Sequence, residues 1–556
     1  MHPKPFAPAT SAVARRRRRA SPAVGVILVV LLASTACRTS RPTATLPASS
    51  ARLDGLNVQL VPDDEGREAV RFGWGATATF EARLPADTTG LTLTVRGDQC
   101  EGPPTYRVTV DGLTVVDDVA SSADWTARTY AWRLLAGTHV IEVAYTNDHR
   151  AFGCDRNLHL ASIELVSNPD EPVVTNAAIP SRGFVHPWGT LLLDGANRPL
   201  RLRGVNLGGW LLWEGWIWSE GFDYVGQSQM MANIAALVGQ PRAETFARDV
   251  QANYVTGDDF RALASYGFNV VRVPINHDLL EDDAAPFAYK SSGWAVLDDI
   301  VARARQHGVY VVFDLHAAPC SQSLSFISDW DGSSYLWLSP TCQDRAVALW
   351  RAIAARYAGE RIVAGYDLLN ETVTGDEQLL DWYRRVTTAI REVDRNHTLI
   401  YEGNNLARDF GFIPSALDPN MMISAHDYPW MTLGQDLSDR VPAYVEAATR
   451  LNVPMWIGEF GQSSYDDLLR YVRTFDGTPT FAGFAQWTWK QAPGAATLQT
   501  IRHTPASKKL VGWMTNTSRP KPSAAEAEQG MADFVAAVRF VDTLPDARTR
   551  QVLTGR

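Results

Sequence analysis

Two stretches decide the fold of this chain: Ile362-Val-Ala-Gly-Tyr-Asp-Leu-Leu-Asn-Glu371 and Val453-Pro-Met-Trp-Ile-Gly-Glu459. Each is a near-continuous apolar run that ends in a glutamate, and such runs are typical of strands in a buried parallel sheet. In a barrel of parallel strands, the C-terminal strand ends meet on one face, where the chemistry of such barrels takes place. We therefore expect Glu371 and Glu459 to lie on the same face.

Outward from these stretches, strands and helices alternate from residue 183 onward. Eight segments are predicted as strands: 202–208, 269–275, 310–316, 363–371, 398–404, 422–428, 454–460 and 481–490. Amphipathic helices are expected between several of them, as at 345–357, where apolar residues recur at helical spacing. This alternation predicts a (β/α)8 barrel over 183–545.

The segment 53–167 has a different pattern. Short alternating runs such as Leu91-Thr-Leu-Thr-Val95 and Tyr106-Arg-Val-Thr-Val110 are separated by turn residues. Period-two alternation with frequent turns predicts an all-β sandwich. Residues 168–182 are rich in Pro and polar residues and are predicted to link the sandwich to the barrel.

Length and charge limit the classes of partner. The chain has 556 residues, enough for two domains, and a formal net charge of −9. Its basic residues form no cluster beyond the five arginines at 15–19, so we expect no nucleic-acid partner. We expect a monomer.

Residues 1–37 resemble a lipoprotein-type signal peptide. The arginines at 15–19 precede an apolar stretch over 23–36, which is too short to cross a bilayer comfortably. It ends at Ser34-Thr-Ala-Cys37, which resembles a bacterial lipobox with Ser34 where Leu is usual. We expect Cys37 to carry a lipid anchor, followed by a polar tether over 38–52. The protein is then exported to the bacterial cell surface; the alternative is plain cleavage and secretion.

The remaining four cysteines fit export. Two lie in each half of the chain, and in an oxidising compartment they are expected to form the disulfides Cys100–Cys154 and Cys320–Cys342. No cysteine pair has the spacing of a zinc site.

Polar and aromatic residues gather at the predicted strand ends: Arg272, His316, Asn370, Glu371, His426, Tyr428, Glu459 and Trp487. Two glutamates carried to one face by different strands are what glycosidic-bond hydrolysis requires. Asp314 and Glu402 also lie near strand ends and are the alternative carboxylates.

The same residues carry a family resemblance. The motifs are Gly204-Val-Asn-Leu-Gly-Gly-Trp210, Arg272-Val-Pro, Asp314-Leu-His316, Asn370-Glu371, His426-x-Tyr428, Gly458-Glu459-Phe460 and Trp487-Thr-Trp-Lys490. In this order they resemble glycoside hydrolase family 5, over about 183–542. One departure is Thr372, where the family usually has Pro after the glutamate.

The resemblance implies a role for each matched residue. Glu371 is expected to be the general acid/base and Glu459 the nucleophile, which Arg272 and Tyr428 keep ionised. Asn370 is expected to bind the sugar 2-hydroxyl, and Trp487 to stack under the ring beside the cleaved bond. His316 and His426 are expected to position Glu371 and the sugar. A nucleophilic mechanism requires a carboxyl separation of about 5–5.5 Å and gives retention at the anomeric carbon.

The substrate expected from the resemblance is a polysaccharide, namely a β-1,4- or β-1,3-linked glucan. The motif that ends at Trp210 and the stretch Leu315-His-Ala-Ala-Pro-Cys-Ser-Gln322 look most like the exo-β-1,3-glucanase branch. Mannan and xylan are alternative substrates within the family. Aromatic residues between Cys320 and Cys342 are interpreted either as subsite walls or as a packed loop: Phe326, Trp330, Tyr335 and Trp337. An alternative of another class is a non-catalytic glycan-binding protein at the cell surface.

The sandwich has its own signature, in the loops around Arg96-Gly-Asp-Gln-Cys100 and Thr146-Asn-Asp148. It resembles the calcium-dependent carbohydrate-binding modules of families 36 and 60. That resemblance implies a Ca²⁺ ion, which prefers oxygen ligands. The expected ligands are Asp98, Glu101, Asp148 and Asp155; the alternative is an ordinary spacer domain. No cofactor is expected for catalysis.

Overall fold

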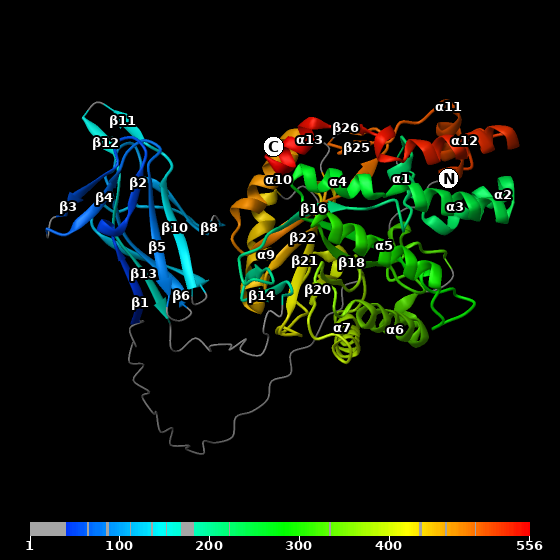
Figure 1. Cartoon of the computed structure of the whole chain (residues 1–556), viewed down its shortest axis with the longest axis horizontal. Helices are drawn as coiled ribbons and strands as arrows, with labels where there is room; N and C mark the ends of the chain where they lie inside the picture. The colour runs from blue at the N-terminus through cyan, green and yellow to red at the C-terminus, as the bar shows by residue number, and fades with distance from the viewer. Residues whose placement is uncertain are drawn as a thin grey trace, which may run out of the picture. The chain divides into compact units, whose positions relative to one another are not determined.

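The computed structural model describes residues 41–555 except 64–65, 85–87, 112, 135–136, 152, 168–182, 222, 333–334, 433–435, 462–463 and 495. The predicted signal peptide with Cys37 and the linker at 168–182 lie outside the described residues. Figure 1 shows strands alone in the N-terminal part of the described chain and alternating strands and helices after it. Within the described ranges, no helix is long and apolar enough to cross a membrane.

Two antiparallel sheets form a β-sandwich, as predicted. The first sheet contains β1 (Arg41–Pro47), β3 (Gln59–Pro62), β4 (Glu68–Phe72), β6 (Thr88–Gly97), β9 (Thr126–Leu134) and β13 (Leu158–Ser167). The second contains β2 (Arg52–Asp54), β5 (Thr77–Leu84), β7 (Thr105–Val110), β8 (Leu113–Val119) and β10 (Gly137–Tyr145). Their orders are β3-β4-β13-β6-β9, with β1 beside β13, and β2-β5-β10-β7-β8. A hairpin of β11 (His149–Ala151) and β12 (Cys154–Arg156) lies just before β13.

Alternation along the strands places the sandwich core. In β5, Ala78, Phe80, Ala82 and Leu84 are buried, while the residues between them are partly or fully exposed. Side chains of successive strand residues point to opposite faces, so one face of the sheet is apolar and packs against the other sheet.

The predicted tether at 38–52 differs from the structure. From residue 41 onward it forms β1, a short 3-10 helix η1 (Ala48–Ser50) and the start of β2, with Leu46 and Ala48 buried in the sandwich core. Composition concealed the strand because Pro42 and Pro47 are tolerated in β1, which pairs with β13 alone and is therefore an edge strand.

The predicted (β/α)8 barrel is confirmed. Eight parallel strands close in chain order. They are β16 (Leu202–Asn206), β17 (Val270–Asn276), β18 (Tyr310–Ala317), β19 (Val363–Asp367), β20 (Thr398–Glu402), β21 (Met421–Asp427), β22 (Met455–Phe460) and β23 (Phe481–Gln486). The strand β19 ends at Asp367, so Glu371 lies in the loop that follows it, not on the strand.

Helices surround the barrel strands (Figure 1). The α-helices are α1 (Gly215–Trp218), α2 (Gln227–Val238), α3 (Gln240–Tyr254), α4 (Gly257–Tyr266), α5 (Ser291–His307), α6 (Pro340–Tyr357), α7 (Asp376–Arg391), α8 (Asn404–Ala407), α9 (Leu437–Leu451), α10 (Tyr465–Gly477), α11 (Pro505–Thr515), α12 (Ala524–Ala537) and α13 (Ala547–Thr554). The 3-10 helices are η2 (His277–Leu279), η3 (Phe326–Ser328), η4 (Leu336–Leu338), η5 (Pro429–Thr432) and η6 (Phe540–Asp542). Short strands complete the domain: β14 (His186–Trp188), β15 (Leu191–Leu193), β24 (Lys490–Gln491), β25 (Gln499–Thr500) and β26 (Leu544–Pro545).

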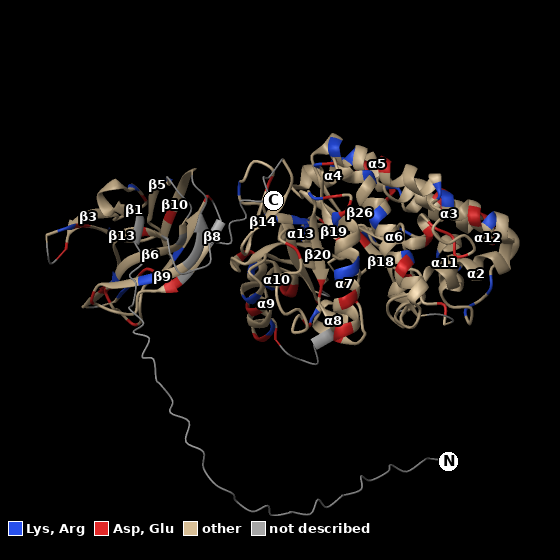
Figure 2. Ribbon diagram, turned by 90° about the horizontal axis from the view of Figure 1, so that it is seen from below, with Lys and Arg blue, Asp and Glu red and all other residues tan. Residues whose placement is uncertain are grey.

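Local sequence explains where these helices begin. In α6, the Ser339 side chain accepts a hydrogen bond from the Cys342 backbone at 3.3 Å, and Pro340 occupies the first helical position. Both features are typical of a helix N-terminus. Figure 2 shows positively and negatively charged residues interspersed over these helices.

The inside of the barrel has an apolar layer with a charged layer above it. Val270, Val312 and Ile400 belong to one buried apolar cluster. Two residues further along the same strands stand Arg272, Asp314 and Glu402, all buried. Because strand side chains alternate with a period of two, each of these residues points to the same side as the apolar residue before it.

Both predicted disulfides are present in the structure. Cys100 is bonded to Cys154 in the sandwich, and Cys320 is bonded to Cys342 across the long loop after β18.

A buried ion pair ties α4 to the segment after β23. The ammonium of Lys490 lies 2.6 Å from the Asp259 carboxylate, and neither side chain is exposed. The carboxylate also accepts a hydrogen bond from the Trp489 indole at 2.8 Å, and the ammonium donates to the backbone carbonyls of Tyr254 and Val538. All of the charge on this pair is therefore compensated inside the protein.

The variant Asp259→Asn is expected to lower the free energy of unfolding by about 3–5 kcal/mol, because it leaves the buried Lys490 ammonium without its counter-charge. Urea denaturation followed by tryptophan fluorescence measures the loss. The control Asp381→Asn removes an exposed partner of Arg384 and should cost less than about 1 kcal/mol. Equal losses in both variants would contradict this account of the pair.

Candidate active site

The two predicted catalytic glutamates come together at the C-terminal face of the barrel. One carboxylate oxygen of Glu371 and one of Glu459 lie within 4.8 Å of each other, and a nitrogen of His426 lies within the same distance of both. Both glutamates are almost completely buried, with 5% and 4% of their surface exposed. This separation agrees with about 5–5.5 Å for a nucleophilic mechanism and not with about 6.5–9.5 Å for an inverting one.

The carboxylate of Glu459 is held on both oxygens. Arg272 donates to Oε1 at 2.6 Å, and the Tyr428 hydroxyl donates to Oε2 at 2.8 Å. Burial raises the pKa of Glu459, while His426 and Arg272 act in the opposite direction. Because Glu459 lies inside β22, its backbone is fixed by the barrel ladder.

Glu371 is held at its backbone and at its side chain. Its residue adopts a positive φ of 43°, and its N–H donates to Oε2 of Glu402 at 2.7 Å. Its Oε1 lies 2.8 Å from Nδ1 of His426. Burial alone would lower the pKa of His426, but Glu402, Glu459 and Glu371 raise it well above its ordinary value.

The other predicted contacts line the same face. His316 stacks on Trp487 with 5.3 Å between ring centroids, and it lies 2.6 Å from Asp314. Burial lowers the pKa of His316 to about 4, so the ring is neutral at physiological pH. The amide oxygen of Asn370 accepts from Arg272 at 2.8 Å, while its amide nitrogen is buried and has no partner among the described residues. That nitrogen is an unsatisfied hydrogen-bond donor.

The prediction missed Glu214. It lies in the segment between β16 and α1, is 3% exposed, and accepts a hydrogen bond from the Trp216 indole at 2.8 Å. Burial raises its pKa to about 8, with further effects from Glu459 and Glu371. Glu214 is therefore a further buried carboxyl group that interacts electrostatically with the pair. The only sequence signal was its position in a Trp-rich stretch after the first barrel strand.

The aromatic residues between the bonded Cys320 and Cys342 divide into two groups. Trp337 is buried and donates to the Gln322 carbonyl at 2.9 Å, so it packs the loop and is no subsite wall. Trp330 is 39% exposed. Phe326 packs against the exposed Tyr224, with 5.2 Å between ring centroids. Tyr335 donates to the Val373 carbonyl at 2.7 Å. The subsite interpretation is therefore kept for Phe326, Trp330 and Tyr335.

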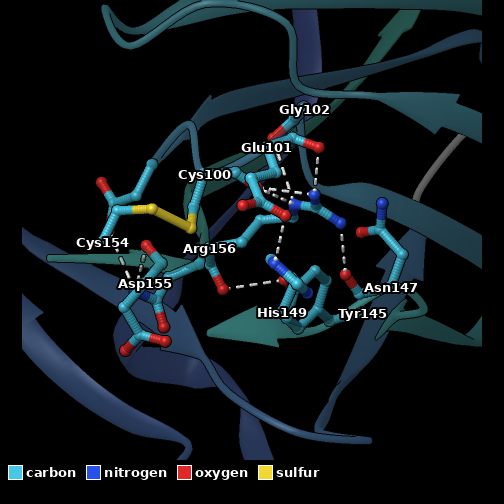
Figure 3. Close-up of a disulfide and its surroundings, with 11 residues drawn as sticks. Cys100, Glu101, Gly102, Tyr145, Asn147, His149, Cys154, Asp155 and Arg156 are labelled. Atoms are coloured by element: carbon cyan, nitrogen blue, oxygen red, sulfur yellow. Dashed lines mark hydrogen bonds and ion pairs between the residues drawn. A yellow bond between two sulfur atoms is a disulfide. The ribbon is translucent and has the colours of Figure 1, made fainter. Parts of the chain in front are cut away.

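In the sandwich, the structure places an arginine at the centre of the signature loops (Figure 3). The guanidinium of Arg156 donates to the backbone carbonyls of Cys100, Glu101, Gly102 and Asn147 at 2.6–3.1 Å. With the Cys100–Cys154 disulfide, it holds the two loops together. The sequence did not predict this role, because the motif does not indicate which backbone carbonyls the arginine binds.

The four predicted calcium ligands are not gathered into one cluster. Asp98 accepts from His159 at 2.9 Å, Glu101 lies 2.9 Å from His149, and Asp155 lies 3.5 Å from Arg71. The clusters of three acidic or histidine side chains in the described part of the chain are both in the barrel. The donor chemistry fits Ca²⁺, since all four residues are carboxylates and those of Asp98, Glu101 and Asp155 are 40–68% exposed. The individual ligands stay a prediction.

A parallel eight-stranded barrel with two buried, bridged glutamates on its C-terminal face has the fold and site of a retaining glycoside hydrolase. Comparison with protein families gives the family. Residues 235–491 match "Cellulase (glycosyl hydrolase family 5)", and residues 90–176 match "Ca-dependent carbohydrate-binding module xylan-binding", family 60. The match over 235–491 confirms the resemblance of the barrel to glycosyl hydrolase family 5, and the match over 90–176 confirms the resemblance of the sandwich to modules of family 60.

Relatives with curated names match parts of this chain. "Beta-xylosidase" of Phanerodontia chrysosporium is 35% identical over 249 residues, which are 43% of this chain and 51% of that protein. "Probable glucan 1,3-beta-glucosidase A" of Emericella nidulans is 28% identical over 330 residues, 55% of this chain and 78% of that protein. "Endoglucanase C" of Acetivibrio thermocellus is 30% identical over 165 residues, which are 29% of this chain and 46% of that protein. The chain spans about half the length of the first and the third.

The variant Tyr428→Phe is expected to reduce kcat/KM about tenfold to hundredfold, since a hydrogen bond to a charged group contributes about 1.5–3 kcal/mol. Losing the donor destabilises the ionised form of Glu459, so the pKa of Glu459 rises further and the acidic limb of the pH–rate profile moves to higher pH. Glycoside hydrolysis measured across pH tests both effects.

The matched control is Tyr444→Phe, which removes a buried hydroxyl that donates to Asp427 at 3.1 Å and does not touch the glutamate pair. It should leave the acidic limb in place. A Tyr428→Phe variant with an unchanged profile would show that the hydroxyl does not act on Glu459.

Proposed function

We propose that this protein is an exported retaining β-glycosidase that hydrolyses a β-1,4- or β-1,3-linked glucan, and that its sandwich binds the polysaccharide. The observation that carries the proposal is the buried pair of Glu371 and Glu459, with oxygens within 4.8 Å and each glutamate held by its own hydrogen bonds. Paired carboxylates at this separation serve double displacement.

In the first step, Glu459 attacks the anomeric carbon while the carboxyl proton of Glu371 passes to the glycosidic oxygen, which leaves as an alcohol. Arg272 and Tyr428 aim the nucleophile, because each binds a different oxygen of Glu459. A covalent glycosyl-enzyme ester results. The free amide N–H of Asn370 is suited to the sugar 2-hydroxyl, a contact that strengthens in the transition state.

In the second step, Glu371 takes a proton from water, and the water oxygen attacks the same carbon and releases Glu459. The two inversions give net retention. His426 lies 2.8 Å from Glu371 and 3.6 Å from Glu459. It is therefore close to the negative charge in both steps, first when the charge passes from Glu459 to Glu371 and then when it returns. A sugar hydroxyl in place of water would give transglycosylation by the same steps.

β-Glucan is the first candidate substrate, because the glucanase-like motifs after β16 and β18 agree with the names of two of the relatives. Xylan is the second candidate. Two findings favour it: the relative named "Beta-xylosidase" at 35% identity, and the description of the sandwich family as xylan-binding. Mannan has no finding of its own in its favour.

The sandwich would raise the local concentration of polysaccharide at the barrel by tethering. Ca²⁺ would be held by carboxylate oxygens from Asp98, Glu101, Asp148 and Asp155, where it would bind sugar hydroxyls. Export is supported by the two disulfides, because such bonds persist in oxidising compartments. Lipid anchoring at Cys37 is part of the same proposal, with secretion as the alternative.

The first experiment measures product release from β-1,4-glucan, β-1,3-glucan, mixed-linkage glucan, mannan and xylan, with products sized by chromatography. We expect one glucan or xylan to be cleaved with retention by proton NMR. Glu459→Gln should lower the rate by at least about 10⁴-fold, because it removes the nucleophile. If the wild type cleaves nothing but binds a polysaccharide, the glycan-binding alternative replaces the enzyme.

Removal of calcium is expected to abolish binding by the sandwich and to spare the barrel. Affinity electrophoresis in gels containing xylan or β-glucan should show retardation with Ca²⁺ and none with EDTA, while hydrolysis of a short soluble oligosaccharide continues unchanged. Asp155→Asn should weaken Ca²⁺ binding by calorimetry. The control Glu81→Gln alters an exposed carboxylate on β5 and should not. Retardation that persists in EDTA would contradict the calcium proposal.

A further inference from the structure

Beneath the glutamate pair, Glu402 at the end of β20 uses both of its carboxylate oxygens. Oε2 accepts the backbone N–H of Glu371 at 2.7 Å. Oε1 accepts from Arg272 at 2.9 Å and lies 3.1 Å from Nε2 of His426. The side chain has no exposed surface, so these contacts occur without competition from water.

These contacts connect Glu402 to Glu371 in two ways, directly and through His426. The backbone N–H of Glu371 is bound directly by Glu402, and its Oε1 is bound by Nδ1 of His426, whose other nitrogen faces the same Glu402. A single buried carboxylate therefore fixes the acid/base at the start and at the end of its side chain.

The backbone of Glu371 needs such a support. Its φ of 43° lies in the left-handed region, which a residue with a β-carbon adopts rarely and which persists only where the surroundings determine it. A buried backbone N–H also requires an acceptor, and here that acceptor is a carboxylate.

We propose that Glu402 is the positioning residue for Glu371, setting the direction from which the acid/base delivers its proton. The inference rests on the proposed glycosidase function and deepens it. Glu402 does not touch the substrate. It acts through the backbone of Glu371 and through His426.

The two neighbouring buried acids do not share this role. Asp367 contacts Arg272 at 2.8 Å, and Asp314 contacts Arg272 at 3.1 Å and His316 at 2.6 Å. In the described structure neither forms a hydrogen bond with Glu371. Asp314 and Asp367 contact Arg272, which binds the proposed nucleophile Glu459. Glu402 contacts Arg272 as well, but it also binds the proposed acid/base Glu371.

The titratable groups that surround Glu402 and His426 come from five other barrel segments. They are Arg272 on β17, Asp314 and His316 on β18, Asp367 on β19, Glu371 after β19, and Glu459 on β22. Of all the groups that raise the pKa of His426, Glu402 has the largest effect. Removing its charge lowers the pKa of His426. The alkaline limb of the pH–rate profile, where His426 loses its proton, then moves to lower pH.

The test variant is Glu402→Gln, which keeps the shape of the side chain. An amide has one accepting oxygen, so its nitrogen must face either the Glu371 N–H or the Arg272 guanidinium. On 4-methylumbelliferyl β-glucoside, whose leaving group needs protonation, kcat/KM should fall about tenfold to hundredfold. On 2,4-dinitrophenyl β-glucoside, whose leaving group needs no proton, it should fall less than about threefold. The matching β-xylosides serve if the polysaccharide panel identifies a xyloside.

Two further variants separate positioning from a general loss of structure. Glu281→Gln alters another unexposed carboxylate that is bound to an arginine, Arg345, and that makes no contact with the glutamate pair; its profile should match the wild type. Glu402→Asp keeps the charge and should restore the alkaline limb but not the full rate. Equal losses on both aryl glycosides, or no loss with an unshifted alkaline limb, would overturn the inference.

The outcome also separates this inference from the proposed function. A wild type that cleaves neither the aryl glycosides nor the polysaccharides contradicts the function itself. A wild type that is active and inactivated by Glu459→Gln, but indifferent to Glu402→Gln, contradicts only the role of Glu402.

Discussion

The buried guanidinium of Arg272 is the interaction on which the barrel site depends. It bonds to Asp367, Glu402 and Glu459 at 2.6–2.9 Å and to Asp314 at 3.1 Å, with no exposed surface. Burial raises the pKa of Asp314 to about 8 and that of Asp367 well above its usual range, so burial disfavours the ionised form of both carboxyl groups. Arg272 opposes that effect at both carboxyl groups, and together with His426 it also faces Glu402 and Glu459. This balance allows a polar layer to stand directly on an apolar core.

Much of this arrangement follows from sequence pattern. Apolar runs that end in polar residues predicted the barrel, and the ends of those runs carried Glu371, Glu459 and their neighbours to one face. Glu214 and the role of Glu402 required coordinates. A buried carboxylate is recognised by what surrounds it. The partners of Glu402 come from β17, the loop after β19 and β21, which are separated in the sequence.

The sandwich shows the same limit in another form. Alternation predicted its strands, but the edge strand β1 was hidden by its prolines, and Arg156 by the lack of any signal for its carbonyl partners. Likewise, the aromatic residues of the 320–342 loop read alike in sequence, yet Trp337 packs the loop while Trp330 is partly exposed. Burial of an aromatic in a loop depends on loop conformation, which local sequence determines poorly.

The backbones of Glu371 and Glu459 belong to different kinds of structural element. Glu459 lies inside β22, whereas Glu371 lies in a loop four residues beyond the end of β19. In the proposed mechanism, the nucleophile Glu459 attacks one atom, the anomeric carbon, and benefits from the rigid backbone of a barrel strand. An acid/base must serve two oxygens in turn, first the departing alcohol and then the incoming water, which do not occupy identical places. Because Glu371 lies in a loop, its carboxyl group can move slightly between two successive partners. Its contacts with Glu402 on β20 and His426 on β21 keep that movement small.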